Sequence, residues 1–492
     1  MQSATRIVVC GTIAKFVTDN WIDVQFAGHA CLALPLHGRQ SVRPSSSGVA
    51  QTDDPRLAAA VMMAIRIALL QTALALTAAK QPTFYRDVLP ILQQHCQNCH
   101  RPGERAPMPL ETYQQVRSWA VEIRETTQLR KMPPWFAERT PSDACYPHFS
   151  NDPSLTRQQI DTIAAWVRAG SPSGTANDAP PPVEWTNGWN IDAPDVVFTM
   201  PQAKSIPPKG EISYQFVIIP THFKEDRWVQ MSEIRPGNRS VVHHAVAYIR
   251  TPQSKWLRKA PEGAIFGTEE IRDPELEKQA LWTDDDLLLV YTPGASPDRW
   301  PEGMAKLIPA GSDIVLQMHY TASGKATMDR TSIGLVFAKQ LPLKRVLTLQ
   351  LNKVDFIIPP GVPNYRAEVH GSMPNDALLL SLYPHLHLRG KSFEYNILEP
   401  GGRSKTLLRV AHYDSYWQLN YRLAEPIPLK AGTVLQAVAT WDNSKNNPHN
   451  PDPETAVYWG GQVWEEMMVG FFDVAVDPAV NRRSFFLRRD LR

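Results

Sequence analysis

Five histidines in three apolar segments are the residues best suited to chemistry. His385 and His387 are separated by one residue in LYPHLHLRG, and alternate side chains of a strand share a face, so this pair can chelate one ion. His243 and His244 are adjacent in VVHHAVAYI and would point to opposite faces of a regular strand, so sharing a metal requires a bulge or a strand end. His319 lies in DIVLQMHY. Imidazole suits zinc, copper, iron and nickel, so the ligand type alone does not select the metal.

A second chemical motif, C-x-x-C-H, occupies residues 96–100. Its two thiols, Cys96 and Cys99, can add to the two vinyl groups of a haem, while the imidazole of His100 ligates the iron. The sequence holds no second C-x-x-C, which a zinc site of two such pairs would need. The motif therefore predicts one covalently attached haem c.

The segments on either side of this motif predict a small all-α domain. Residues 87–95 place apolar side chains at helical spacing directly before Cys96. Residues 156–169 form a second amphipathic segment, which ends at Gly170. Two helices that bracket the motif, with a proline-rich loop between them, resemble a class I cytochrome c domain.

The sixth ligand of the haem iron is expected to be a methionine or histidine between these helices. Met132, in LRKMPPWF, is the preferred candidate, and Met108, in RAPMPL, is its competitor. His95 and His148 are lesser candidates.

The chain around these motifs divides into several predicted parts. Residues 62–79 have the charged, apolar and small-residue order of a secretory signal, so we interpret residues 1–79 as a mis-called start followed by that signal. The predicted parts that follow are a cytochrome c-like domain (80–172), a linker rich in proline and serine (173–189), a first sandwich (190–340), a second sandwich (341–480) and a tail (481–492).

Short β-rich runs separated by turns predict two antiparallel β-sandwiches after the linker. The first set of runs is 196–200, 213–220, 227–234, 241–249, 286–291, 313–320 and 332–338. The second set is 346–351, 377–388, 392–398, 406–411, 434–441 and 467–474. The break between the sets lies near residues 338–344.

Composition excludes several classes of protein. Of 492 residues, 43 % are apolar and 20 % charged, which excludes wholesale disorder. Lys and Arg number 51 and Asp and Glu 49, without the basic surplus of a nucleic-acid-binding protein. Five cysteines are too few for a disulfide scaffold. The apolar run within 62–79 is too short for a transmembrane span.

The order and spacing of the histidines resemble the copper type II, ascorbate-dependent monooxygenases, the family of the peptidylglycine α-hydroxylating and dopamine β-monooxygenases. The resemblance covers roughly residues 190–480. It implies two jelly-roll-like sandwiches, each carrying one copper, with a solvent-filled cleft between them.

The resemblance also implies two copper-ligand sets. The family's adjacent His pair and its Leu-Gln-x-His-Tyr strand match the first set, which is His243, His244 and His319. Its His-x-His pair and thioether match the second set, which is His385, His387 and Met467, with Met468 as the near alternative.

The sequence departs from this family where the substrate carboxylate would bind. The family's Arg, Asn and Tyr clamp is replaced by Tyr383, Val469 and Phe471. Without a bidentate guanidinium, a glycine-extended peptide is a poor substrate, and a neutral small organic molecule is expected.

The resulting expectation is an exported, periplasmic or secreted, monooxygenase with one covalent haem c and two coppers. Its expected partners are O2, a small-molecule substrate and an external electron donor, either a small reductant or a redox protein, whose electrons pass through the haem. No nucleic acid and no transmembrane span in the mature chain are expected. The alternative is a copper and haem electron-transfer or copper-binding protein without oxygenase activity.

Overall fold

The computed structural model describes residues 6–10, 13–17, 81–104, 106–138, 147–185, 188–267, 286–399, 402–480 and 485. Two compact units divide the chain, Met1–Ala79 and Lys80–Arg492. In the first unit, β1 (Arg6–Cys10) and β2 (Ile13–Val17) form an antiparallel pair. The expected signal at 62–79 and nearly all of the expected tail at 481–492 lie outside the described residues. Among the described helices, none has the length and apolar character needed to cross a membrane.

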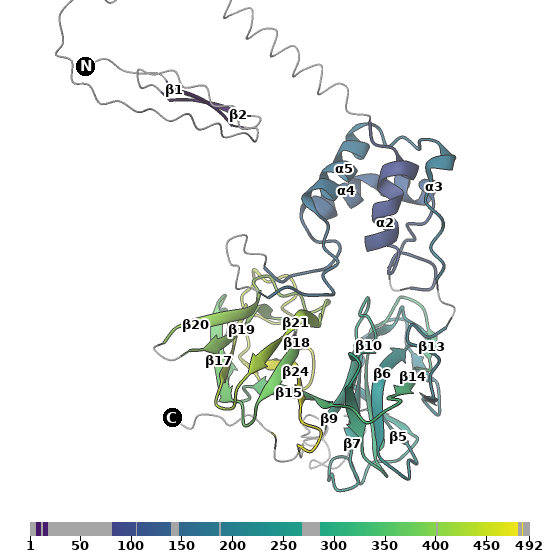
Figure 1. Ribbon diagram of the computed structural model, residues 1–492, viewed down its shortest axis with the longest axis vertical. Helices are drawn as coiled ribbons and strands as arrows, with labels where there is room; N and C mark the ends of the chain where they lie inside the picture. The colour runs from purple at the N-terminus through teal and green to yellow at the C-terminus, as the bar shows by residue number, and fades with distance from the viewer. Residues whose placement is uncertain are drawn as a thin grey trace, which may run out of the picture. The chain divides into compact units, whose positions relative to one another are not determined.

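A group of short helices opens the second unit (Figure 1). They are η1 (Phe84–Val88), α2 (Leu89–His95), α3 (Tyr113–Ser118), α4 (Ala120–Gln128), α5 (Arg157–Arg168) and η2 (Ala176–Asp178). The two helices predicted around the C-x-x-C-H motif are confirmed as α2 and α5. Thr156 begins α5 with a capping box, in which its hydroxyl accepts from the Gln159 amide, and the helix ends before Gly170.

The remainder of the second unit is mostly β-structure, as the sequence predicts. Its first strands are β3 (Val196–Thr199), β4 (Lys204–Ile206), β5 (Gln215–Pro220), β6 (Arg227–Arg235), β7 (Val242–Arg250), β8 (Ile265–Gly267), β9 (Asp286–Tyr291), β10 (Asp298–Arg299), β11 (Met304–Ile308), β12 (Asp313–Tyr320), β13 (Thr327–Asp329) and β14 (Ser332–Phe337). The later strands are β15 (Lys344–Asn352), β16 (Ile357–Ile358), β17 (Tyr365–Ser372), β18 (Ala377–His385), β19 (Gly390–Leu398), β20 (Ser404–Val410), β21 (Tyr421–Leu429), β22 (Val434–Trp441), β23 (Val457–Tyr458) and β24 (Val469–Val476). Every predicted β-run overlaps one of these strands.

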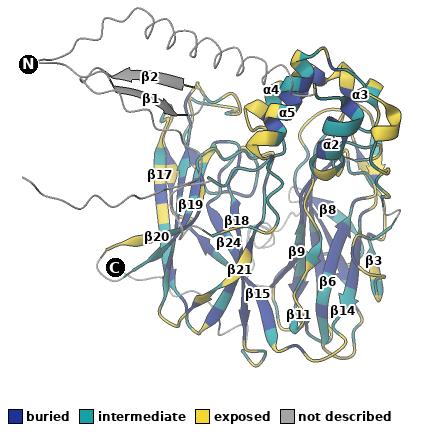
Figure 2. Cartoon of the chain, turned by 45° about the horizontal axis from the view of Figure 1, so that its top comes forward, coloured by how far each residue is buried: buried dark blue, intermediate teal, exposed yellow. Residues whose placement is uncertain are grey.

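The first set of strands forms two sheets around a shared core. One sheet has the order β8-β5-β12-β7-β9, and strands β11, β6, β14 and β3 lie consecutively in another. Apolar side chains of both sheets meet in one buried cluster, to which Val217 contributes from β5 and Val229 from β6. Alternate residues of β5, β7 and β12 belong to this cluster. Figure 2 shows that buried residues, in dark blue, are concentrated in the strands. We refer to this part as the first sandwich.

The second set builds a similar pair of sheets, the second sandwich. Strands β21-β18-β24-β15 pack against a sheet of order β17-β22-β19-β20. Their shared core includes Leu382 of β18, Phe393 of β19 and Phe472 of β24. The β18–β24 pair is antiparallel and aligns His385 with Val469, which fixes the position of the His-x-His segment.

One sheet runs without interruption through both sandwiches. Met304 and Ala305 of β11 pair in parallel with Lys344 and Arg345 of β15, and this joins the strands into a nine-stranded sheet. The segment 338–343, where the sequence predicts the break, connects β14 to β15. The two sandwiches therefore share backbone hydrogen bonds as well as side-chain contacts.

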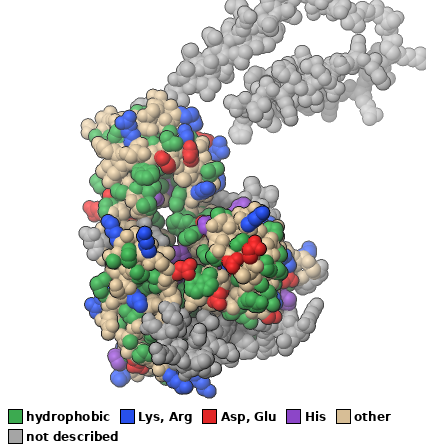
Figure 3. Space-filling model, turned by 180° about the vertical axis from the view of Figure 1, so that it is seen from behind, with side chains coloured by type: hydrophobic (Ala, Val, Ile, Leu, Met, Phe, Trp, Pro, Cys, Tyr) green, Lys and Arg blue, Asp and Glu red, His purple; other side chains and the backbone are tan. Residues whose placement is uncertain are grey.

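Charges of both signs are mixed over the described surface. On the face shown in Figure 3, Lys and Arg side chains are interspersed with Asp and Glu side chains. This agrees with the near balance of 51 basic and 49 acidic residues in the sequence.

Candidate metal centre

A β-bulge brings His243 and His244 to the same side of the first sandwich. In the β7–β12 pair, His319 aligns with His244 while the next residue, Tyr320, aligns with Val242. His243 is therefore the extra residue of a bulge. The bulge that sequence reasoning required for a shared metal is present.

The three histidines of the first set converge on one point. Their candidate ligand atoms all lie within 4.8 Å of one another, and Nδ1 of His243 is 3.2 Å from Nδ1 of His244. Metal–nitrogen bonds of about 2.0–2.1 Å place two nitrogens of one site roughly 3–4 Å apart. The first set can accordingly hold a single ion with little rearrangement.

Burial keeps the first set in the form that binds metals. All three side chains are buried, and the ring of Tyr214 packs against both His244 and His319. Burial first, and then the neighbouring imidazoles, lower the pKa of His244 well below its usual value. A neutral imidazole offers the lone pair that a metal needs.

Hydrogen bonds orient both rings of the His-x-His pair. Nδ1 of His387 lies 3.2 Å from the carbonyl oxygen of Glu465, and Nδ1 of His385 lies 2.9 Å from Oε1 of Gln418. Because these oxygens can only accept, each Nδ1 carries the proton and each Nε2 keeps its lone pair. Nε2 of His387 is buried and makes no hydrogen bond, so its lone pair is available to a metal ion.

The pKa values of this pair have the same physical cause. Burial lowers the pKa of His385 to about 4 and that of His387 to about 3. For His387 the charge of His385 adds to the effect of burial, while hydrogen bonds to backbone groups oppose it. Both rings are therefore neutral at pH 7.

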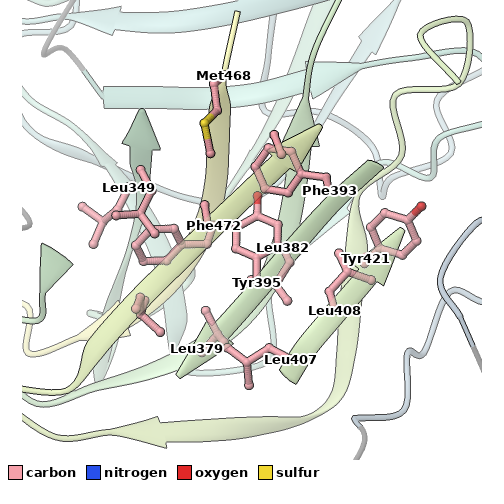
Figure 4. Close-up of a cluster of buried hydrophobic side chains, with 14 of the residues drawn as sticks. Leu349, Leu379, Leu382, Phe393, Tyr395, Leu407, Leu408, Tyr421, Met468 and Phe472 are labelled. Carbon is pink, nitrogen blue, oxygen red and sulfur yellow. The ribbon is translucent and has the colours of Figure 1, made fainter. Parts of the chain in front are cut away.

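The two candidate methionines have different surroundings. Met468 is fully buried and belongs to the core cluster of the second sandwich, part of which Figure 4 shows. Met467 is half-buried. The β18–β24 ladder ends at the His385–Val469 pair, two residues short of Met467. Because the side chain of Met468 is part of the core, Met467 stays the preferred thioether candidate for the second set.

Tyr383, Val469 and Phe471 lie on the same face of the β18–β24 pair as His385. Tyr383 aligns with Phe471 and His385 with Val469, and paired residues of an antiparallel ladder point to the same side. The ring centroids of Tyr383 and Phe471 are 5.9 Å apart, and those of His385 and Phe471 are 6.5 Å apart. Tyr383, Val469 and Phe471 thus give this face an apolar part, while Gln418 and the charged side chains of Arg422 and Asp298 line the adjoining cavity.

Glu466 is a supporting residue that sequence reasoning missed. Its fully buried carboxylate accepts from the backbone N–H of His387 at 3.0 Å, from that of Arg389 at 2.6 Å and from Nε1 of Trp441 at 3.0 Å. Burial raises its pKa to about 7, against the lowering effect of these donors. The only sequence signal was its place directly before Met467.

The C-x-x-C-H segment, residues 96–100, directly follows α2. Within it, the His100 amide donates to the Cys96 carbonyl at 2.9 Å. Nδ1 of His100 lies 3.1 Å from the carbonyl oxygen of Met108, so Nε2 is free of the proton and available to an iron. Burial raises the pKa of Cys96 to about 12.

Met108 and Met132 occupy different places relative to His100. The Met108 carbonyl lies on the Nδ1 side of the imidazole, which is the side away from an iron bound at Nε2. Met132 lines a cavity of about 1290 Å³ together with Leu155 and Ile160. Segments 388–391, 412–417 and 442–449 of the second sandwich complete this cavity.

Comparisons with known proteins give no functional assignment. No family model matches the chain, and no curated protein matches it. Among solved structures, the PBCV-1 VP54 structure fitted into a reconstruction of the virophage Sputnik is 8 % identical with a TM-score of 0.21, and covers 60 % of this chain and 100 % of that one. The infectious bursal disease virus Gt strain structure is 10 % identical with a TM-score of 0.14, and covers 61 % and 77 %. Such low scores do not indicate a shared fold.

Proposed function

We propose that the chain is a haem- and copper-dependent monooxygenase that hydroxylates a neutral small organic molecule with O2. The observation that carries this proposal is the convergence of His243, His244 and His319 across a bulge. A bulge that turns two adjacent imidazoles toward a third has no evident packing purpose in an apolar strand pair. The ligand pattern also follows that of the copper type II, ascorbate-dependent monooxygenases.

The two ligand sets would hold one copper each. The first is entirely imidazole, and the second combines two imidazoles with the softer thioether of Met467, which favours Cu(I). Copper in these sets supplies one-electron redox chemistry and a place for O2 to react. The chain's part is to keep His385 and His387 neutral through Gln418 and the Glu465 carbonyl, and to surround them with apolar side chains.

The helical part would hold the haem through Cys96, Cys99, His100 and Met132, as a class I cytochrome c domain does. The thiol of Cys99 lies close to Gly294 of the first sandwich. The approach is so close that the Cβ of any side chain at position 294 would be 3.1 Å from Sγ of Cys99. Met132 is preferred as the methionine ligand from its sequence context, and Met108, which packs against the same apolar cluster as Cys96, is its competitor. A haem supplies single electrons.

An ion-pair bridge holds the C-x-x-C-H region on the first sandwich. Glu104 accepts from Arg101 at 2.9 Å and from Arg239 at 2.9 Å. Arg239 lies four residues before His243. This contact supports passage of electrons from the haem to the first ligand set, with an external donor reducing the haem after export to the periplasm or beyond.

The apolar face of the second set supports a neutral substrate. The two cations that line the adjoining cavity, Arg422 and Lys306, already lie beside Asp298 and Asp473. A carboxylate buried beside Tyr383, Val469 and Phe471 would therefore add a charge without a cation of its own, and burying an unpaired charge costs several kcal/mol. Neutral aromatic or aliphatic compounds avoid that cost.

A second candidate function is electron transfer or copper binding without oxygenase activity. It is favoured by the small space at the second set, since the cavity that Tyr383 and Phe471 line has a volume of about 30 Å³. That is room for about one water molecule.

The deciding experiment combines metal analysis with O2 uptake. Purified chain should contain one covalent haem and two coppers, and a reduced donor should drive O2 uptake that depends on a neutral organic compound. The His243→Ala variant should lose one copper, while His370→Ala, at a half-buried histidine of β17 outside both sets, should retain both.

Each alternative result has a defined meaning. Haem that acid–acetone extracts from the native chain contradicts the covalent site, and so does haem that resists extraction from a Cys96→Ala, Cys99→Ala double variant. Stoichiometric zinc in place of copper contradicts the redox proposal. Copper and haem reduction without substrate-dependent O2 uptake selects the second candidate function, and faster uptake with glycine-extended peptides contradicts the neutral substrate.

A further inference from the structure

The two histidine sets are in contact with each other across the sandwich interface. The ring centroids of His244 and His385 are 6.3 Å apart. Within the sets, the corresponding separations are 4.9 Å for His244 and His319 and 5.2 Å for His385 and His387. A ring contact at this distance leaves no layer of bulk water between His244 and His385. The family resemblance, by contrast, implies a solvent-filled cleft between the two sandwiches.

His243 also contacts an aromatic ring of the second sandwich. The ring of Tyr416, from the segment between β20 and β21, lies 6.2 Å from that of His243. His243 and His244 therefore each face a ring supplied by the second sandwich.

An ion pair beside these rings also joins the two sandwiches. Nη2 of Arg422, on β21, is 2.7 Å from Oδ1 of Asp298, on β10, and Nη1 donates to the Pro297 carbonyl at 3.0 Å. Both side chains are largely shielded from water, so solvent screens this pair less than an exposed one.

A buried lysine makes a third connection. The amine of Lys306, on β11, donates to the Leu287 carbonyl at 2.8 Å and to the hydroxyl of Thr348, on β15, at 2.9 Å. Asp473, on β24, lies 3.7 Å from the amine and accepts from Thr348 at 2.6 Å. Separating the sandwiches would break the Lys306–Thr348 hydrogen bond and remove the Lys306 amine from Asp473.

The space next to these contacts is nearly filled. The cavity of about 30 Å³ is lined by Leu289 of β9 on one side and by Tyr383 and Phe471 on the other. Where the described residues of the two sandwiches meet here, side chains occupy the interface.

We propose that the two ligand sets form one closed centre, in which the His244–His385 ring contact joins two metal sites across an interface held by Arg422–Asp298 and the Lys306 hydrogen bonds. This inference rests on the proposed function for the identity of the metals. Electrons exchanged between the sites would cross packed imidazole rings rather than water. Access of a substrate would require entry along another path or separation of the sandwiches.

Electron paramagnetic resonance of the full chain loaded with Cu(II) tests this proposal without any measurement of activity. Two cupric ions in one closed centre should give a spectrum with dipolar broadening and a half-field transition. Reference spectra come from single-site variants, His243→Ala for the second set alone and His385→Ala for the first set alone. A doubly loaded spectrum equal to the sum of these two references would overturn the closed centre.

A second pair of variants tests what holds the centre closed. The double variant Arg422→Gln, Asp298→Asn should reduce the broadening while both coppers stay bound. The matched control is Arg366→Gln, Glu368→Gln, which removes an exposed ion pair of 2.6 Å on β17 and should leave the spectrum unchanged. Equal broadening in both double variants would refute the holding role of the Arg422 pair.

Failure of the inference and failure of the proposed function are distinguishable. A chain that binds fewer than two coppers fails the proposed function by metal analysis before any spectrum is compared. A chain with two coppers and substrate-dependent O2 uptake, but with additive spectra, keeps the proposed function and refutes only the closed centre.

Discussion

Removal of the Glu466 carboxylate should destabilise the second sandwich strongly. The Glu466→Ala variant leaves three buried donors without an acceptor: the amides of His387 and Arg389 and the indole of Trp441. Each orphaned buried donor costs about 1–3 kcal/mol. Allowing for water that enters the space, we expect a loss of about 3–6 kcal/mol in the free energy of unfolding. That is a large share of the roughly 5–15 kcal/mol typical of a folded chain.

The Glu466→Gln variant should fall between the native chain and Glu466→Ala. Two of the three donors, from His387 and Trp441, bind the same oxygen, Oε2. An amide oxygen in that position keeps both bonds, while its NH2 group would face the Arg389 amide and lose the third. We expect a loss of about 1–3 kcal/mol from that orphaned donor.

Urea unfolding of the metal-free full chain, followed by tryptophan fluorescence, measures these differences. Glu454→Ala is the matched control, because Glu454 is exposed on the connection between β22 and β23, and its change should stay within about 0.5 kcal/mol. The reasoning is refuted if Glu466→Ala loses less than about 1 kcal/mol, or if Glu466→Gln is the less stable of the two.

Three further predictions follow from the same residues. Met467→Leu should lower the copper content by one ion per chain with little change in the free energy of unfolding. Met468→Ala should lower the free energy of unfolding by about 2–5 kcal/mol and leave the copper content unchanged. Atomic absorption and urea unfolding distinguish the two variants, and the reverse pattern would exchange the roles of the two methionines. Met132→Leu should shift the reduced absorption spectrum of the haem and Met108→Leu should not. Burial raises the pKa of Glu466 from 4.5 to about 7, so between these pH values the folded chain binds more protons than the unfolded chain. The contribution of Glu466 to the free energy of unfolding therefore falls as pH rises from 4.5 to about 7. Glu466→Gln should remove this pH dependence, which urea unfolding at several pH values measures.

The regular elements could be predicted because each leaves a local signal in the sequence. Short β-rich runs between turns identified strands such as β7 and β12, and the helical spacing of Ile160 and Ile163 identified α5. Strand β21 was missed since Pro426 and Pro428 interrupt its run, and proline normally marks an edge strand or a turn.

The same holds for the candidate sites: residues within one short motif could be predicted, whereas residues that meet only in the folded chain could not. Residue type and spacing identified His385 and His387, and also the need for a bulge at His243. No local pattern could identify Gln418, which reaches His385 from a position 33 residues away. The contact between His244 and His385 depends on how two separately predicted sandwiches meet, and the sequence of neither one contains that information.

The parallel pairing of β11 with β15 limits how the chain can be dissected. Each strand has the other sandwich as its neighbour on one side, so a cut in the segment 338–343 would turn both into exposed edges with unsatisfied N–H and C=O groups. Exposed edges invite pairing with other chains. The two halves, produced separately, should therefore aggregate or recombine with each other. In gene fusions and truncations, the two sandwiches should be kept together as one folding unit.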